Sequence, residues 1–271
     1  MTTVLKGIKL RLYPNKQQQA QLCQMFGNDP FVWNQMLDMA KQRYQNNPNS
    51  QFVDQYGMDV LLKPLKQEYP FLKRSDSTSL QVVNHNLYQA FQRLFKHLGG
   101  YPRFKSRRSA KQSYTGKSKI GYIKTSKTRQ LTHCKIKRYT VSYDPSGRYY
   151  LSLQVETTVQ PLSKTSQQVG IDVGATNLAI TNDGHKYAKF DAVWLTQQAQ
   201  HWQSKYSHRR HQATVSVRQW NHNHQDVKEE LNDYQNWQRA RIQKARYQRR
   251  VADQRRDYLH KLTMALVTQD D

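Results

Sequence analysis

Acidic residues are scarce in this sequence relative to basic ones. Its 271 residues include 43 Lys and Arg but 19 Asp and Glu, which leaves a formal net charge of +24 at pH 7. So many like charges repel one another in a compact fold, so such an excess usually indicates a protein that binds a polyanion. Nucleic acid is therefore the expected partner. An anionic membrane surface is the alternative, but the sequence shows no basic amphipathic anchor.

Cysteine and long apolar runs are scarce as well. Cys23 and Cys134 are the two cysteines, they are far apart, and they form no CxxC pair. This pattern favours reduced thiols over a zinc site or a disulfide framework. No apolar run is long enough for a membrane span, and the N-terminus lacks the apolar core of a signal peptide. We therefore expect a cytoplasmic, soluble protein with no zinc and no membrane partner.

The first part of the chain predicts a strand followed by a helix, a break and a second helix. Apolar and basic residues alternate over residues 4–12, which is typical of a half-buried strand. Asn15 can cap a helix that runs to Phe26, with Gly27 closing it. Asp29-Pro30 then has the form of an N-cap followed by proline at the start of the next helix.

Two further helices complete a predicted helical unit over residues 14–100. A shorter helix is expected around residues 60–65. A longer amphipathic helix is expected to open at Ser77-Thr78-Ser79, because apolar residues then recur at helical spacing. Gly99-Gly100 is expected to stop it.

The character of the sequence changes at Tyr101, where a basic segment with interleaved aromatic residues begins. Lysine and arginine side chains can contact phosphates, and aromatic rings can stack on bases. The plainer alternative is a solvated loop, since charge runs are usually surface. The candidate nucleic-acid-binding residues of this segment are Arg103, Phe104, Lys105, Arg107, Arg108, Lys111 and Tyr114.

The second half predicts a hairpin and then long helices. Residues 139–143 and 149–156 flank the turn DPSG, which carries standard turn residues. With the first strand, this hairpin suggests a small β-barrel into whose first connection the helical unit is inserted. Residues 194–267 are basic and helical, with a thin apolar stripe. Such a helix can lie along a nucleic-acid backbone, or it can be one arm of a helical hairpin.

Asp172 lies within the apolar stretch VGIDVGATNLAITNDG. A carboxylate in an apolar strand is usually paired or holds a metal. Nucleases of the ribonuclease H-like superfold place an aspartate on their first strand as a Mg²⁺ ligand. Sugar kinases and chaperone-type ATPases share an I-D-x-G-x-T-N phosphate loop, but no second phosphate loop follows here. A structural aspartate at a strand end is the plain alternative.

Several blocks, in this order, resemble the TnpB/OrfB family of insertion-sequence proteins. They are KGIKLRLYPNKQQQAQL, FVWNQMLDMAKQRY, LYQAFQRLF with GGYPRFKSRR, DPSGRYYLSLQVE, GIDVGATNLAITNDG and RRDYLHKLTMALV. The resemblance spans nearly the whole chain. It implies an RNA-guided DNA endonuclease that holds a guide RNA and a target DNA, with Mg²⁺ as the metal.

The resemblance also implies an α+β multidomain fold. Residues 1–13 and 101–165 would form a wedge-like β-barrel, residues 14–100 a helical recognition lobe, and residues 166–271 a partial RuvC-like domain. Asp172 matches the first RuvC aspartate, which makes it the candidate catalytic and Mg²⁺-binding residue. Arg103, Phe104 and Lys105 match a basic block that contacts nucleic acid.

The sequence departs from the family after the block RRDYLHKLTMALV. The family continues with a catalytic glutamate, a zinc ribbon and a third carboxylate, none of which this sequence contains. We therefore expect a shortened protein that does not cleave. The alternative hypotheses are a nuclease-dead, RNA-guided repressor and a general RNA-binding protein of ribosomal type. Glu229 with Glu230, or Asp270 with Asp271, are the other acids to consider, but neither pair lies on an apolar strand that could direct it at Asp172.

Overall fold

The computed structural model describes residues 2–106, 112–115, 122–126, 131, 134–159, 168–224 and 226–268. The chain divides into two compact units. Residues 1–144 with 148–160 form the N-terminal unit, and residues 145–147 with 161–271 form the C-terminal unit. Helices and antiparallel strands occur in both units, which confirms the predicted α+β class.

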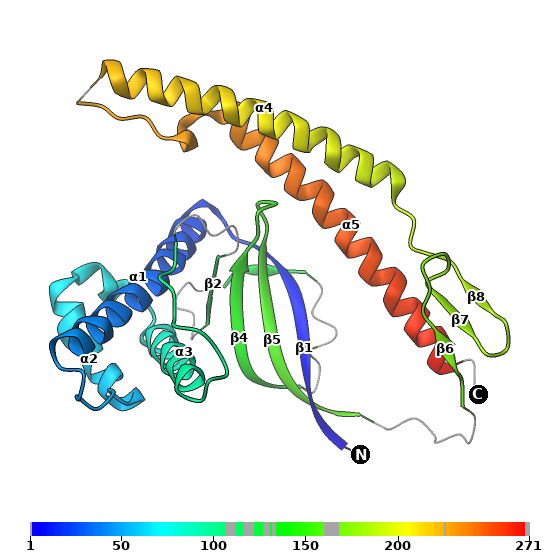
Figure 1. Cartoon of the computed structure of the whole chain (residues 1–271), viewed down its shortest axis with the longest axis horizontal. Helices are drawn as coiled ribbons and strands as arrows, with labels where there is room; N and C mark the ends of the chain where they lie inside the picture. The colour runs from blue at the N-terminus through cyan, green and yellow to red at the C-terminus, as the bar shows by residue number, and fades with distance from the viewer. Residues whose placement is uncertain are drawn as a thin grey trace. The chain divides into compact units, whose positions relative to one another are not determined.

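The N-terminal unit contains a five-stranded antiparallel sheet in the order β2-β4-β5-β1-β3 (Figure 1). β1 and β5 pair along their lengths, from Thr2 opposite Val159 to Leu12 opposite Tyr149. β4 and β5 form the hairpin predicted around DPSG, which is confirmed. In the described part of the chain β2 and β3 each pair with one neighbour, so these strands form an open sheet. The strands are β1 (Thr2–Tyr13), β2 (Gln112–Thr115), β3 (Lys124–Thr125), β4 (Lys135–Tyr143) and β5 (Tyr149–Val159).

A single helix, α1 (Lys16–Asn46), follows β1, and the predicted break at Gly27 is wrong. Asn15 caps the helix as predicted, but Asp29 is not an N-cap and Pro30 lies inside the helix. The helix continues because residues of its middle turn are held by tertiary contacts. Asn28 Nδ2 donates to Ser75 Oγ at 2.6 Å, and Ser79 Oγ donates to the Asp29 carboxylate at 2.8 Å.

The two halves of α1 belong to different hydrophobic cores. The first half packs on the sheet, where Leu22, Met25 and Phe26 are buried against Leu12, Tyr114, Val141 and Tyr149. The second half packs on α2 (Gln55–Glu68) and α3 (Ser77–Phe95), in a core that includes Trp33, Met36, Leu37, Leu62, Leu65, Leu80, Leu87 and Phe91. α1 therefore joins the sheet to the helices within one unit, as Figure 1 shows.

The helices α2 and α3 lie where the sequence predicts them, with different ends. Aspartates cap both: Asp54 accepts from the Gly57 N–H at 2.7 Å, and Asp76 accepts from the Thr78 N–H at 3.0 Å. α3 ends at Phe95, before the two glycines that were expected to stop it. His97 adopts a φ of 56°, so the reversal of the chain occurs there. A short 3₁₀ turn, η1 (Pro70–Arg74), links α2 to α3.

The C-terminal unit contains a small sheet and a helical hairpin. β6 (Ile171–Asp172), β7 (Ala179–Thr181) and β8 (Lys186–Tyr187) form a three-stranded antiparallel sheet. α4 (Val193–Asn223) and α5 (Gln235–Thr268) then run side by side, joined by a loop with the short turn η3 (Leu231–Asp233) (Figure 1). The helical-hairpin interpretation of this region is confirmed.

Few large side chains hold the hairpin together, as the thin apolar stripe predicts. Ala213 and Ala240 are buried between the helices, which allows the backbones to approach. Tyr206 of α4 packs near Trp237 of α5, with ring centroids 6.3 Å apart. None of the helices within the described ranges combines the length and apolar character that crossing a bilayer requires.

The continuity of α1 can be tested with a pair of glycine substitutions. A Cβ added at Gly27 or at Gly184 meets nothing within 4 Å, but Gly184 has a φ of 82° and Gly27 has no such left-handed φ. Gly27→Ala should raise the free energy of unfolding by about 0.4–1 kcal/mol, since alanine favours a helix interior. Gly184→Ala should lower it by roughly 1 kcal/mol. Denaturant unfolding of both variants checks this, and a destabilising Gly27→Ala would contradict the continuous helix.

Candidate nucleic-acid interface

The segment 101–106 has no regular secondary structure, yet side chains of α1 hold its backbone. The Asn34 side chain makes two hydrogen bonds to Lys105: its Oδ1 accepts from the Lys105 N–H at 2.7 Å, and its Nδ2 donates to the Lys105 carbonyl at 2.9 Å. Trp33 Nε1 donates to the Arg103 carbonyl at 3.0 Å. Arg103 and Lys105 are thus fixed on either side of Phe104.

The side chains of this segment differ in what they offer to a ligand. Arg103 is exposed, and Phe104 is 53% exposed although it is a large apolar residue. Lys105 is exposed as a residue, but its Nζ lies 4.0 Å from the centre of the Trp33 ring. Desolvation there lowers the pKa of Lys105, and the nearby Asp29 carboxylate opposes the shift. Arg103 and Phe104 are therefore the freer pair for a phosphate and a base.

Asp29 is a buried carboxylate beneath this segment. Burial raises its pKa to about 7, while the hydrogen bond from Ser79 and the charge of Lys105 act in the opposite direction. Asp76 adds a further, smaller upward shift. The local sequence predicted a helix cap at Asp29, and nothing in it indicates the contact with Ser79, fifty residues away.

The other candidate residues of the basic segment are less informative. Tyr114 on β2 is 2% exposed, and its ring centroid lies 5.9 Å from that of Phe26. Its ring is part of the sheet core, so the stacking role predicted for Tyr114 does not fit its position. Arg107, Arg108 and Lys111 lie outside the described residues, and their predicted contacts stay predictions.

Asp172 ends the short strand β6 and is exposed. Its apolar neighbours are exposed as well: Ile171 is 45% and Val173 is 73% exposed. The premise that Asp172 lies inside a buried apolar strand is therefore wrong for this structure. No group of three or more His, Cys, Asp or Glu residues that could hold a metal occurs among the described residues.

The acids considered as substitutes have local roles where they are described. Glu229 accepts a hydrogen bond from the Tyr234 hydroxyl at 2.6 Å, and its backbone N–H donates to Asn221 at 2.8 Å. Glu230 begins the turn η3, where its N–H donates to Asp233 at 2.8 Å. Both glutamates thus shape the loop between α4 and α5. Asp270 and Asp271 lie outside the described residues.

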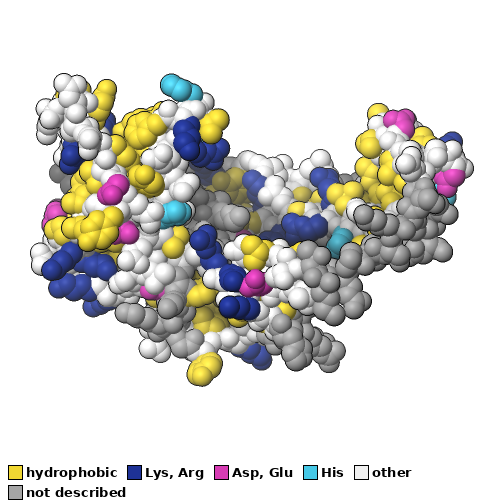
Figure 2. All heavy atoms as spheres, turned by 90° about the horizontal axis from the view of Figure 1, so that it is seen from below, with side chains coloured by type: hydrophobic (Ala, Val, Ile, Leu, Met, Phe, Trp, Pro, Cys, Tyr) yellow, Lys and Arg dark blue, Asp and Glu magenta, His cyan; other side chains and the backbone are white. Residues whose placement is uncertain are grey.

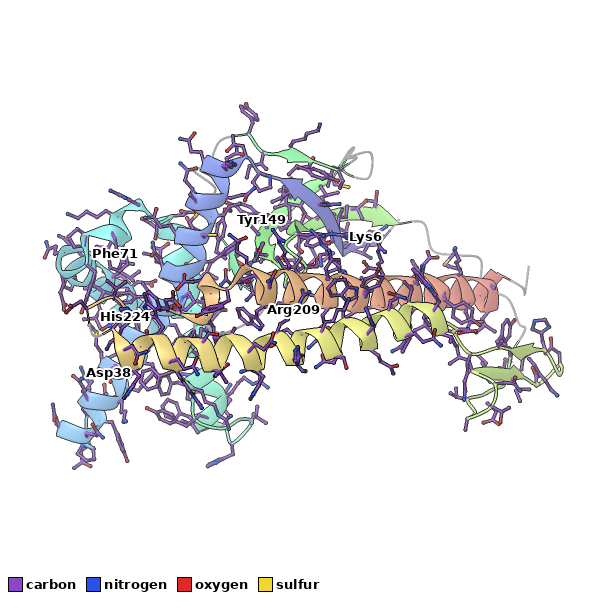
Figure 3. All side chains as sticks on the ribbon, turned by 90° about the horizontal axis from the view of Figure 1, so that it is seen from above. Lys6, Asp38, Phe71, Tyr149, Arg209 and His224 are labelled. Atoms are coloured by element: carbon purple, nitrogen blue, oxygen red, sulfur yellow. The ribbon has the colours of Figure 1, made fainter. Side chains whose placement is uncertain are left out.

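The α4–α5 hairpin carries cations next to aromatic rings. Lys244 of α5 lies 4.5 Å from the ring centre of Tyr206 on α4. Lys205, Arg241 and Arg250 lie over Trp202, Trp237 and Tyr247 at 5.0, 5.3 and 5.5 Å. Arg209, labelled on α4 in Figure 3, donates from Nη1 to the Asn236 carbonyl at 3.2 Å. Part of the positive charge therefore also serves to hold the two helices together.

Basic side chains occur at several places on the face of the molecule that Figure 2 shows. On the face shown in Figure 2, Lys and Arg side chains are widely distributed, and acidic side chains are scattered singly among them. His224, labelled in Figure 3 at the end of α4, stacks on Trp220 with ring centroids 3.8 Å apart. The tripeptide His222-Asn223-His224 is thus the last turn of a helix and its cap, and no metal ligand set includes it among the described residues.

Two family models match this chain. One, described as a helix-turn-helix domain of the IS605 OrfB proteins, matches residues 1–48. The other, described as "Probable transposase" of the same OrfB group, matches residues 151–271. Within the described residues 2–48, the structure has the strand β1 and one continuous helix, α1, and no turn divides that helix.

Two curated relatives match almost the whole chain. A "Putative RNA-guided DNA endonuclease" of Streptomyces pristinaespiralis is 28% identical over 285 residues, which cover 100% of this chain and 66% of the relative. The "Putative RNA-guided DNA endonuclease InsQ" of Escherichia coli K12 is 27% identical over 278 residues, which cover 97% of this chain and 63% of the relative. The chain therefore spans about two thirds of the length of these relatives.

The buried Asp29 predicts a specific pH dependence of stability. Its folded pKa of about 7 lies above the ordinary 3.8, so between these values the folded state holds a proton that the unfolded state has released. Stability from this group is therefore full below about pH 4 and is lost as the pH rises to about 7, by roughly 4 kcal/mol at most. Asp29→Asn cannot ionise and should remove this loss.

The measurement compares the unfolding midpoints of Asp29→Asn and the wild-type chain at acidic and alkaline pH. The variant should gain on the wild type as the pH rises. Ser79→Ala removes the hydroxyl that lowers the pKa of Asp29, so it should extend the loss of stability to higher pH. A difference between Asp29→Asn and wild type that does not change with pH would refute the assignment.

Proposed function

Because the chain belongs to the TnpB/OrfB family of insertion-sequence proteins, we propose that it is an RNA-guided DNA endonuclease-type protein of a transposable element. Its partners in this proposal are a guide RNA and a target DNA, and it acts in the cytoplasm. The observation that carries the proposal is the segment 103–105, where an exposed arginine and an exposed aromatic ring are presented next to each other on a fixed backbone.

The charge of the chain supports the same partners. An excess of 24 positive charges favours binding to a polyanion, and the guide RNA and the target DNA are both polyanions. Cations next to aromatic rings, as on the α4–α5 hairpin, are also found where proteins follow a nucleic-acid backbone. We propose separate nucleic-acid contacts for this hairpin within the C-terminal unit, and we keep the predicted contacts of Arg107, Arg108 and Lys111.

We assign the parts of the chain to the roles that the family implies. Residues 1–13 and 101–165 are the wedge-like part, in which the open antiparallel sheet is the wall of the barrel. Residues 14–100 are the recognition lobe, with α1 reaching from it onto the sheet. Residues 166–271 are the RuvC-like part, supported by the antiparallel pairing of β6, which ends at Asp172, with β7 and by the long helices that follow in the chain.

We assign Asp172 as one carboxylate of a RuvC-type centre that uses Mg²⁺. Two-metal hydrolysis needs several carboxylates, because each of two ions about 4 Å apart must be bound and its charge balanced. No group of three or more potential metal ligands occurs among the described residues, so this assignment concerns Asp172 alone. The nuclease-dead repressor hypothesis is not retained, since the names of the matching relatives describe endonucleases.

The first test of the proposal is the salt dependence of RNA binding. If the protein neutralises about 6–10 phosphates, its affinity should fall by roughly 10³–10⁵ between about 50 and 200 mM salt. Arg103→Ala should reduce the slope of log affinity against log salt by about 1. Fluorescence anisotropy with a labelled RNA from its own locus measures both, and a flat salt dependence of the wild-type chain would reject the polyanion partner.

The second test concerns cleavage by the chain of 271 residues. With guide RNA from its locus, a plasmid target and Mg²⁺, cleavage is measured for the wild-type chain and for Asp172→Ala. Asp172→Ala should leave RNA binding unchanged. Cleavage by the wild-type chain that is lost in Asp172→Ala would support the role assigned to Asp172, and cleavage that persists in the variant would refute it.

A further inference from the structure

Asn34 and Trp33 emerge as residues that act on the proposed interface without belonging to it. We propose that they are positioning residues, whose side chains fix the backbone of residues 103–105 so that Arg103 and Phe104 are presented to a single-stranded nucleic acid. This inference rests on the proposed function, because it assigns a purpose to contacts beneath the segment that the function requires.

The geometry of the contacts supports this role. The carboxamide of Asn34 satisfies both backbone polar groups of Lys105, and the Trp33 indole satisfies the carbonyl of Arg103. These residues are 70 or 71 positions apart in sequence, so the contacts exist only in the folded protein. A segment without regular secondary structure normally satisfies such groups with water. Here these backbone groups are fixed on both sides of Phe104, and we call this set of three hydrogen bonds the clamp.

The exposure of Phe104, whose side chain takes no part in the clamp, also supports the positioning role. The apolar ring of Phe104 is 53% exposed between two anchored residues, although nearby aromatic residues pack together. Tyr101, for example, contacts Phe91 with ring centroids 5.7 Å apart. A fixed backbone keeps Phe104 from folding back onto the helices. An exposed ring held in one orientation is a suitable surface for stacking a base.

The clamp should strengthen binding by reducing the conformational entropy that the segment loses when it binds. An unstructured basic loop must be ordered when it binds, and the entropy lost in ordering weakens binding. The clamp orders the backbone of the segment before the ligand arrives. Pro102, which is buried, restricts the backbone further at the preceding position. A preordered pair of Arg103 and Phe104 can then contact a phosphate and the adjoining base together, which fits a single strand whose bases are accessible.

Lys105 takes a different role from Arg103 in this arrangement. Its ammonium group lies over the Trp33 ring, 4.0 Å from the ring centre, and near the buried Asp29. The charge of Lys105 is therefore already partly compensated within the protein. Lys105 is thus held through both its backbone and its side chain, while Arg103 is held through its carbonyl oxygen and keeps its side chain exposed.

The test uses the number of ions released on binding, which an uncharged residue that only stabilises the fold does not change. The probe is a short labelled single-stranded RNA of mixed sequence, titrated with the full chain at several salt concentrations. Arg103→Ala should lower the salt slope by about 0.7, the value for one phosphate contact on a single strand. Asn34→Ala, although it removes no charge, should lower the slope by about the same amount. The double variant should match Arg103→Ala alone, because both changes remove one contact.

Controls separate positioning from folding. Gln45→Ala removes an exposed, neutral side chain of the same helix and should leave the slope unchanged. Trp33→Phe keeps a ring in the core but removes the donor to Arg103, so it should give part of the slope change with the helical circular dichroism intact. This variant keeps the test decisive if Asn34→Ala fails to fold.

The outcomes distinguish this inference from the proposed function. A wild-type chain that does not bind RNA, or an Arg103→Ala variant with an unchanged slope, would overturn the proposed interface and the inference together. The inference alone would be overturned if the wild-type chain binds RNA and Arg103→Ala lowers the salt slope, but Asn34→Ala and Trp33→Phe leave the slope at its wild-type value. An additive double variant would also overturn it, because the two residues would then act independently.

Discussion

The polar contacts that hold the middle turn of α1 are the constraint on which the N-terminal unit depends. A glycine and a proline three residues apart favour a break in a helix, and here the helix continues through both. Asn28 and Asp29 of that turn are buried, and they are bonded to Ser75, just before α3, and to Ser79 in its first turn. Because the helix is unbroken, its first half can pack on the sheet while its second half packs on α2 and α3.

The same helix also determines where the basic segment lies. One turn after Asp29, Trp33 and Asn34 face the chain that leaves α3, and their hydrogen bonds fix residues 103–105. If the helix were broken at Gly27, the orientation of Trp33 and Asn34 would no longer be fixed relative to the sheet. The continuous helix instead connects the helices, the sheet and the segment within the N-terminal unit. Rigid support of this kind is what a binding loop needs to present its side chains in one orientation.

Local patterns were sufficient to predict elements but not the contacts between them. The alternation over residues 4–12, the DPSG hairpin and the amphipathic spacing of the helices are properties of neighbouring residues, and β1, β4, β5, α2 and α3 appear accordingly. The continuity of α1 depends on Ser75 and Ser79, far away in sequence, so the local break signals at Gly27 and Pro30 misled the prediction. For the same reason Tyr114 was assigned to a stacking surface, although packing on Phe26 buries it.

The candidate site was predictable in its residue types but not in its arrangement. A basic, aromatic segment is visible in the sequence, and so is the aspartate of VGIDVG. The clamp is not visible, since Trp33 and Asn34 are ordinary residues of a helix until the chain returns to them. Asp172 illustrates the opposite case: the motif is distinct, but the apolar residues around it are exposed in the structure, so the strand pattern alone did not predict burial.

The few acids of the chain explain why its positive charge stays in large excess. Asp54 and Asp76 cap helices, and Asp183 accepts hydrogen bonds within the turn between β7 and β8. Carboxylates bonded to backbone N–H groups in this way serve local structure. Ion pairs such as Arg249 with Asp253, at 2.9 Å, neutralise single positions along α5. With 19 acids against 43 Lys and Arg, the net charge is +24 whatever local roles the acids take, and a polyanion is the ligand that this excess favours.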